Sequence, residues 1–190
     1  RVAAGEKLSF TQEDIKLDGW AIESRICSED PSRGFLPSSG RILEYKEPPK
    51  SANVRVDSGI SAGGEVSMYY DAMIAKLCTY AKTREEAINF MKKSLSSFVI
   101  KGISHNISFL EAIIHNQRFI DGDINTGFIE QEYPDGFSGA NLTSEISEVF
   151  VSTAIFAFLT EQKRAASLPN QMSDQSAKIG TRWVITIPRV

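Results

Sequence analysis

Hydrophobic and polar residues alternate along the first part of the chain, the pattern of strands with one buried face. The stretch from Trp20 to Ser28 is the clearest case: its even-numbered residues form one face and its odd-numbered residues the other. Turn-forming residues at 29–34 end this strand. The pattern predicts further strands at 41–45, 53–57 and 73–80.

From residue 83 the hydrophobic period changes to that of a helix. Thr83 and Glu86 have the spacing of a capping box, in which each side chain accepts a hydrogen bond from a free backbone N–H. The apolar residues that then recur at helical spacing are Ile88, Met91, Leu95 and Phe98. We expect a helix here, a short apolar segment at 99–103, a second helix over 107–114 and a short third one over 127–131.

Residues 133–139 have the composition of a linker or a turn, and we expect a domain boundary there. A long helix is predicted over about 143–167, because Thr143 can cap it and Pro169 cannot continue it. This helix is apolar nearly all round, which favours burial on two sides. A strand is predicted at 183–187. A single strand cannot bury itself, so we expect the second domain to be incomplete and the chain to be part of a longer protein.

The composition of the 190 residues excludes several classes of protein. The net charge of −3 provides no basic stripe for nucleic acid. The longest apolar run, 149–159, is too short for a membrane helix, which needs about twenty residues. Cys27 and Cys78 lie far apart, so their spacing suggests neither a zinc site nor a disulfide framework. The pattern is that of a soluble α+β domain followed by a helix that leads into a second unit.

Common catalytic motifs do not occur in the sequence: there is no nucleophile elbow, no Walker A loop and no dinucleotide-binding glycine motif. Gly63 and Gly64 lack the Lys-Ser/Thr of a phosphate loop, and we interpret them as a hairpin turn. His105 and His115 lack the carboxylate pattern of a metalloprotease helix, so we interpret both as structural or surface histidines and expect no metal site.

Two pairs of opposite charge lie at strand spacing, Glu23 with Arg25 and Arg55 with Asp57. One interpretation of each is an exposed ion pair worth about 0–1 kcal/mol. The other is an anion site, because guanidinium stays charged and offers a planar fork to a carboxylate or bicarbonate. Spacing alone favours the ion pair.

A set of collinear motifs covers about residues 1–131, and its segments are 19–31, 35–42, 54–59, 69–76, 83–87, 101–106 and 109–110. In sequence and in order, these segments resemble the biotin carboxylases of biotin-dependent acyl-CoA carboxylases. The first of these, Gly19 to Pro31, is similar to the family's G-H-A-[IV]-E-x-R-[IV]-x-A-E-D-P segment. The resemblance implies the C-terminal subdomain of the biotin carboxylase module, an α+β fold with a mainly antiparallel sheet and packed helices.

The same resemblance implies a function for the parent protein and one site residue here. The family uses Mg-ATP to activate bicarbonate and then carboxylates biotin, an ATP-dependent ligase reaction. Arg55 matches the family arginine that contacts bicarbonate and biotin, whereas Glu23 and Arg25 match positions that we interpret as structural. The family's ATP site, metal ligands and biotinylation site match no segment of this chain. We therefore expect biotin, ATP and Mg as cofactors of the parent enzyme, none bound by this chain alone, and no activity of the isolated chain.

The segment 133–143 and the long helix after it resemble the α subunits of propionyl-CoA carboxylases. There the helix starts a small domain through which the α subunit contacts the carboxyltransferase β subunit. This implies two domains, 1–131 and 132–190, the second begun by the helix and a first strand. The implied partners are that β subunit and the biotinylated carrier domain of the same subunit, in an oligomeric complex. The implied compartment is bacterial cytoplasm or mitochondrial matrix. The alternatives are a non-catalytic docking module and the methylcrotonyl-CoA, acetyl-CoA or pyruvate branch.

Overall fold

The structure is a computed structural model that describes residues 1–139 and 143–166. The chain divides into two compact units, Arg1–Gly139 and Ala140–Val190. The division falls at the end of the segment 133–139, whose composition predicts a linker.

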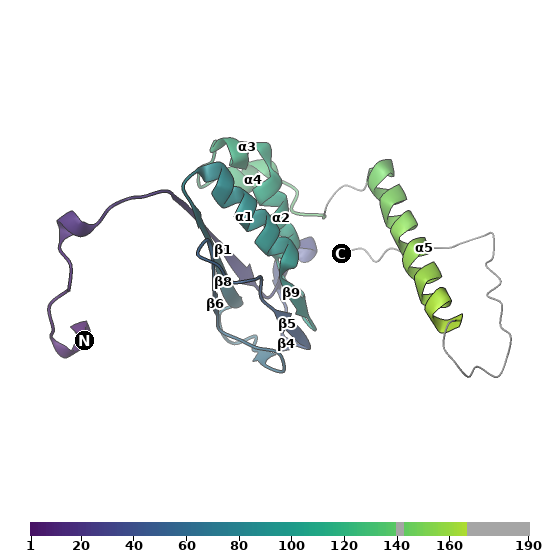
Figure 1. Ribbon diagram of the computed structural model, residues 1–190, viewed down its shortest axis with the longest axis horizontal. Helices are drawn as coiled ribbons and strands as arrows, with labels where there is room; N and C mark the ends of the chain where they lie inside the picture. The colour runs from purple at the N-terminus through teal and green to yellow at the C-terminus, as the bar shows by residue number, and fades with distance from the viewer. Residues whose placement is uncertain (140–142, 167–190) are drawn as a thin grey trace. The chain divides into compact units, whose positions relative to one another are not determined.

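A three-stranded antiparallel sheet forms the centre of the first unit (Figure 1). Its middle strand is β8 (Met73–Ala81), and β1 (Trp20–Cys27) and β6 (Val54–Ser58) flank it. The three strands lie within a residue of the ranges that the alternation predicts, and the predicted α+β class with a mainly antiparallel sheet is confirmed. A bulge between Ile26 and Cys27 ends the regular pairing of β1 with β8.

Three further pairs of short antiparallel strands surround this sheet. They are β2 (Glu29–Asp30) with β3 (Leu36–Pro37), β4 (Gly40–Arg41) with β7 (Glu65–Val66), and β5 (Glu44–Lys46) with β9 (Val99–Lys101). The 3-10 helices are η1 (Val2–Ala4), η2 (Gln12–Asp14) and η3 (Pro31–Arg33). The single strand predicted at 41–45 is therefore wrong, because Ile42 and Leu43 separate two strands that have different partners.

The predicted turn at Gly63 and Gly64 is present, but it is not a hairpin. The N–H of Gly64 donates to the Ser61 carbonyl at 3.0 Å, and Gly63 has a φ of 85°, which favours glycine. The strands on either side of the turn, β6 and β7, do not pair with each other. Strand β7 pairs with β4 instead, which a reading of local sequence cannot show.

Helix α1 (Arg84–Ser97) packs against β8 and β1 and covers one face of the sheet (Figure 1). Its capping box is as predicted, with Thr83 Oγ1 accepting from the N–H of Glu86 and Glu86 Oε2 accepting from the N–H of Thr83, both at 3.2 Å. The predicted apolar stripe is fully buried. Together with inward residues of the sheet it forms the core, whose least exposed members are Ile26, Ile42, Leu77, Met91 and Leu95.

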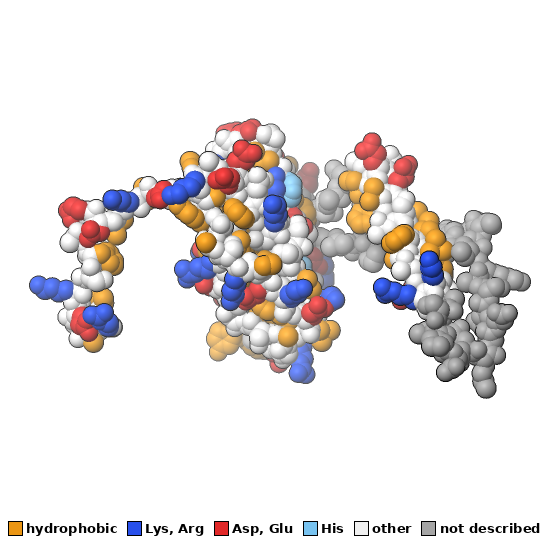
Figure 2. Space-filling model, viewed as in Figure 1, with side chains coloured by type: hydrophobic (Ala, Val, Ile, Leu, Met, Phe, Trp, Pro, Cys, Tyr) orange, Lys and Arg blue, Asp and Glu red, His pale blue; other side chains and the backbone are white. Residues whose placement is uncertain are grey.

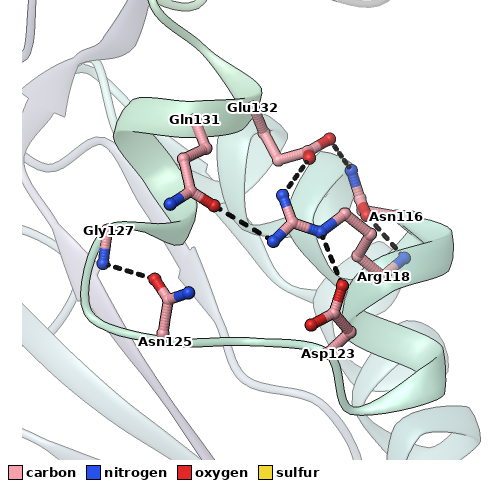
Figure 3. A network of polar contacts seen from close by, with 7 residues as sticks. All are labelled: Asn116, Arg118, Asp123, Asn125, Gly127, Gln131 and Glu132. Carbon is pink, nitrogen blue, oxygen red and sulfur yellow. Dashed lines mark hydrogen bonds and ion pairs between the residues drawn. The ribbon is translucent and has the colours of Figure 1, made fainter.

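Three shorter helices complete the first unit, α2 (Ile107–His115), α3 (Gln117–Asp121) and α4 (Phe128–Glu132). The sequence predicts α2 and α4 but not α3, which is only five residues long. Figure 3 shows how Arg118 of α3 is joined to α4: Nη1 lies 2.7 Å from Glu132 Oε1 and Nη2 lies 3.0 Å from Gln131 Oε1. Asn116 caps α3 by accepting from the N–H of Arg118, and its amide donates to Glu132 at 2.7 Å. These contacts fix the two helices to each other.

The two histidines have different surroundings. His105 is partly buried, and its Nδ1 has no hydrogen-bond partner among the described residues. Burial lowers the pKa of its imidazole below the ordinary value. His115 is exposed, and its Nδ1 lies 2.8 Å from the carbonyl oxygen of Glu111. The part of the chain that the structure describes contains no group of three metal-ligating side chains.

The second unit contains helix α5 (Ser144–Ala166), within the range over which the sequence predicts a long helix. Thr143 caps it, with Oγ1 accepting from the N–H of Ile146 at 3.3 Å. Figure 2 shows apolar side chains along its surface, with acidic side chains at one end and basic ones at the other. Val149 is 65% exposed and Phe156 is 72% exposed. Over the described residues, no helix is long and apolar enough to cross a membrane. The strand predicted at 183–187 lies outside them.

Candidate functional site

The outer face of the central sheet gathers the two charged pairs that the sequence singles out. Antiparallel pairing places Glu23 beside Cys78 and Cys78 beside Arg55, and in the next row Arg25 beside Lys76 and Lys76 beside Asp57. Because residues two apart in a strand share a face, these six side chains lie on the same face of the sheet. We call this set the charged face; its members are Glu23, Arg25, Arg55, Asp57, Lys76 and Cys78.

The inner face of the same strands is apolar and covered by α1. Val54 and Val56 of β6 are 7% and 9% exposed, and Leu77 of β8 is fully buried. The Thr79 hydroxyl donates to the carbonyl of Ala87 in α1 at 3.0 Å, which satisfies the buried hydroxyl of this face. The alternation of β6 therefore buries Val54 and Val56 and leaves the side chains of Arg55 and Asp57 exposed to solvent.

Arg55 and Arg25 each form an ion pair on the charged face. Arg55 is the more exposed of the two, with 76% of its side chain accessible. Its Nε lies 2.9 Å from Oδ1 of Asp57, two residues along the same strand. This hydrogen bond lowers the pKa of the Asp57 carboxyl below its ordinary value and raises the pKa of Arg55. Arg55 makes no other hydrogen bond or ion pair among residues 1–139 and 143–166, so both terminal nitrogens remain available to a ligand.

The second pair on this face is looser. Arg25 Nε lies 3.4 Å from Oε1 of Glu23, and the other carboxylate oxygen of Glu23 lies 3.8 Å from the sulfur of Cys78. Burial and, next, the Glu23 carboxylate raise the pKa of the Cys78 thiol, so the thiol form is favoured at neutral pH. Cys78 therefore separates the two charged pairs as a neutral side chain.

The middle strand β8 contributes a third cation, Lys76, to the charged face. The spacing of residues within β1 or β6 does not predict this, because Lys76 is distant in the sequence from both. Lys76 of β8 lies between Arg25 and Asp57 in the register, and its charge also favours the ionised form of Asp57. The charged face thus carries three cations and two carboxylates. Such a surface suits a small anion, since guanidinium groups bind oxyanions through a planar pair of donors.

Residues from outside the sheet fix the strand ends beside the charged face. Asn106 is 7% exposed, and its side-chain oxygen accepts from the N–H of Cys27 at 2.9 Å. Its amide nitrogen donates to the carbonyl of Arg25 at 3.1 Å. These bonds pair the backbone of β1 at its bulge, where the sheet pattern is interrupted. At the far end of β6, the Ser58 hydroxyl is bound by Tyr45 and Glu47.

Comparison with known families identifies the domain that carries this face. Residues 23–131 match the model of the biotin carboxylase C-terminal domain, which covers more than half of the chain and includes all six members of the charged face. The chain belongs to the biotin carboxylase C-terminal domain family.

Relatives of this chain include carboxylase proteins that are considerably longer than it. The propionyl-CoA carboxylase α chain of Ruegeria pomeroyi is 45% identical over 207 residues, an alignment that covers 98% of this chain and 30% of that protein. Biotin carboxylase 1 of Bacillus subtilis is 49% identical over 130 residues, which covers 68% of this chain and 29% of that protein. The chain therefore spans about a third of the length of these relatives.

A solved structure with the same fold is the biotin carboxylase domain dimer of Hydrogenobacter thermophilus 2-oxoglutarate carboxylase, in complex with MgADP, ADP and bicarbonate. It is 40% identical, with a TM-score of 0.66 over 70% of this chain and 29% of that one. The predicted membership of the biotin carboxylase family is thus confirmed. The binding role predicted for Arg55 stays a prediction, which the position of this side chain on an exposed, cationic face makes testable.

Proposed function

We propose that this chain is a piece of the α subunit of a propionyl-CoA carboxylase and that its charged face binds bicarbonate, biotin or both through Arg55. The parent enzyme would use ATP and Mg to activate bicarbonate, carboxylate biotin and pass the carboxyl group to propionyl-CoA on the carboxyltransferase β subunit. Biotin, when bound, supplies the ureido nitrogen that accepts the carboxyl group. ATP and Mg would be held elsewhere in the subunit, because the family's ATP site and metal ligands match no segment of this chain.

The extent of the alignments supports the propionyl-CoA branch. The alignment with the Ruegeria propionyl-CoA carboxylase α chain continues through 98% of the chain, whereas that with Bacillus biotin carboxylase 1 covers 68%. The similarity thus extends beyond the biotin carboxylase C-terminal domain into the unit that contains α5. The acyl-CoA itself would bind the partner subunit, so the test is an assay of the assembled complex. Carboxylation of propionyl-CoA at a rate at least ten times that of acetyl-CoA supports this branch, and equal rates contradict it.

The free end of Arg55 is the observation that carries the binding role. Its Nε is engaged by Asp57, while its terminal nitrogens have no partner among the described residues. A guanidinium held in this way offers two parallel N–H donors to a carboxylate-like anion, or to negative charge that develops on the ureido oxygen of biotin. The bicarbonate bound to the Hydrogenobacter relative supports an anion of this kind as the ligand.

The experiment uses the complete α subunit and measures carboxylation of free biotin as bicarbonate is varied. We expect Arg55→Ala to slow biotin carboxylation by a factor of about 100, as is typical for the loss of one positioned electrostatic group. Arg55→Lys should recover only part of this, since lysine lacks the planar fork. The matched control is Arg41→Ala, an exposed arginine outside the charged face, which should stay within about twofold of the wild type. Unchanged kinetics with Arg55→Ala, or an equal loss with Arg41→Ala, would contradict the assignment.

A second function, docking to a partner protein, is favoured by the exposed apolar residues of α5. Phe156 is 72% exposed and Val149 is 65% exposed, although apolar side chains of this size are usually covered. We propose that the unit from residue 132 onward begins a domain that contacts the carboxyltransferase β subunit. A pull-down with purified β subunit, using the α subunit with and without residues 133–190, tests this. Equal capture of the two forms contradicts it.

A further inference from the structure

We infer that Asp57 is a positioning residue for Arg55: it holds the guanidinium through Nε so that the two terminal nitrogens face an oxyanion ligand. This inference rests on the proposed binding role of Arg55 and assigns a separate role to its neighbour. The observation behind it is the 2.9 Å hydrogen bond from Arg55 Nε to Asp57 Oδ1.

The geometry of β6 explains why the two side chains meet. Arg55 and Asp57 are two residues apart in a strand whose alternate residues, Val54 and Val56, are buried against the core. The backbone of β6 also pairs with the central strand β8 along its length. Both Cα positions are thus fixed by the sheet, and Asp57 can limit the rotamers of an otherwise exposed arginine.

Because Asp57 binds Nε of Arg55, the two terminal nitrogens of the guanidinium remain available to a ligand. A guanidinium has five N–H donors, one on Nε and two on each terminal nitrogen. A carboxylate that takes Nε leaves the outer edge, with both terminal nitrogens, to receive two oxygens of a ligand at once. An ion pair formed through the terminal nitrogens would instead compete with the ligand. The Arg25–Glu23 pair on the same face also uses Nε, but at 3.4 Å it constrains its arginine less.

A simple electrostatic argument predicts the opposite effect of removing Asp57. The carboxylate is a negative charge beside an anion site, so its removal should strengthen anion binding if charge alone decides. If positioning decides, its removal frees the guanidinium and weakens binding. The sign of the change in the bicarbonate KM therefore separates the two explanations.

The test measures bicarbonate KM and kcat for biotin carboxylation by the complete α subunit. We expect Asp57→Ala to raise the bicarbonate KM about tenfold, because a group displaced by about 1 Å loses much of its effect. Asp57→Asn keeps an oxygen that can accept from Nε, so it should recover part of the loss. Glu44→Ala, which removes an exposed carboxylate paired with Lys101 outside the charged face, is the matched control and should leave KM within about twofold.

A double-mutant cycle with Arg55→Ala shows through which residue Asp57 acts. In the Arg55→Ala background, Asp57→Ala should change neither KM nor kcat further. A lower KM with Asp57→Ala alone, no change, or an undiminished effect in the Arg55→Ala background would each overturn the inference. If Arg55→Ala itself leaves KM and kcat unchanged, the proposed binding role fails instead. Melting temperatures of all variants exclude unfolding as the cause.

Discussion

Asn106 offers a direct test of how the sheet that carries the charged face is stabilised. Its carboxamide accepts from the N–H of Cys27 at 2.9 Å and donates to the carbonyl of Arg25 at 3.1 Å. Both backbone groups lie at the end of β1, where a bulge between Ile26 and Cys27 interrupts pairing with β8. Asn106→Ala removes both contacts and leaves the two backbone groups without their side-chain partner.

The expected loss of stability follows from the partial burial of these two hydrogen bonds. A buried donor or acceptor that loses its partner costs about 1–3 kcal/mol, so two such groups give at most about 2–6 kcal/mol. Water that enters the space left by the carboxamide would restore part of this, and we expect a loss of about 3 kcal/mol in the free energy of unfolding. Asn53 provides a matched control, because it is partly exposed and its amide makes one bond, to the Tyr80 carbonyl at 2.8 Å. Asn53→Ala should cost about 0.5–1 kcal/mol.

The assay is urea unfolding of the purified chain, followed by far-ultraviolet circular dichroism, with the wild type and both variants at one pH. The reasoning requires Asn106→Ala to lose at least about 1.5 kcal/mol more than Asn53→Ala, in line with two partly buried contacts against one exposed contact. Similar losses for the two variants, or a loss below about 0.5 kcal/mol for Asn106→Ala, would refute it. Such a result would mean that the N–H of Cys27 and the carbonyl of Arg25 find other hydrogen-bond partners when Asn106 is removed.

Three further predictions concern stability in the first unit. Burial lowers the pKa of His105, so folding favours the neutral imidazole. Stability should be full above about pH 6.5 and fall as the pH falls below it, and His105→Leu should flatten this dependence. Met91 is fully buried, so Met91→Ala should cost about 2–5 kcal/mol in urea unfolding, whereas Met68→Ala at a 67% exposed position should cost less than about 0.5 kcal/mol. Gly102 has a φ of 106°, and a Cβ there would lie 2.3 Å from the Arg41 carbonyl oxygen, so Gly102→Ala should lower the melting temperature markedly.

The elements that the sequence predicts best are those whose pattern and end signals agree. Helix α1 combines a capping box with an apolar stripe, and its observed start at Arg84 follows directly after the capping residue Thr83. Strand β8 is likewise predicted to within one residue, because its apolar residues fill a central position of the sheet. Prediction from local pattern succeeds in these cases because the apolar residues of the pattern are also the residues that are buried in the folded structure.

Prediction fails where pairing between distant segments decides the structure. Residues 41–45 have the composition of one strand, yet Arg41 pairs with Glu65 and Tyr45 pairs with Ile100. Helix α3 has too few residues for a periodic pattern, and it is defined by Asn116 at its start and by the contacts of Arg118 with α4. A window of ten residues predicts neither the pairing partner of a short strand nor the residues that the end of a long side chain contacts.

The candidate site depends on the same distant pairing, which explains why spacing alone favours two unrelated ion pairs. Glu23 with Arg25 and Arg55 with Asp57 occur in strands β1 and β6, which are not neighbours in the sheet. Strand β8 lies between them and contributes Lys76 and Cys78 to the same face. Within each pair the sequence determines that the charges share a face, but only the strand order determines that the two pairs share one surface. An isolated exposed ion pair contributes little, whereas cations aligned across one face of a sheet would provide the surface that the proposed anion binding requires.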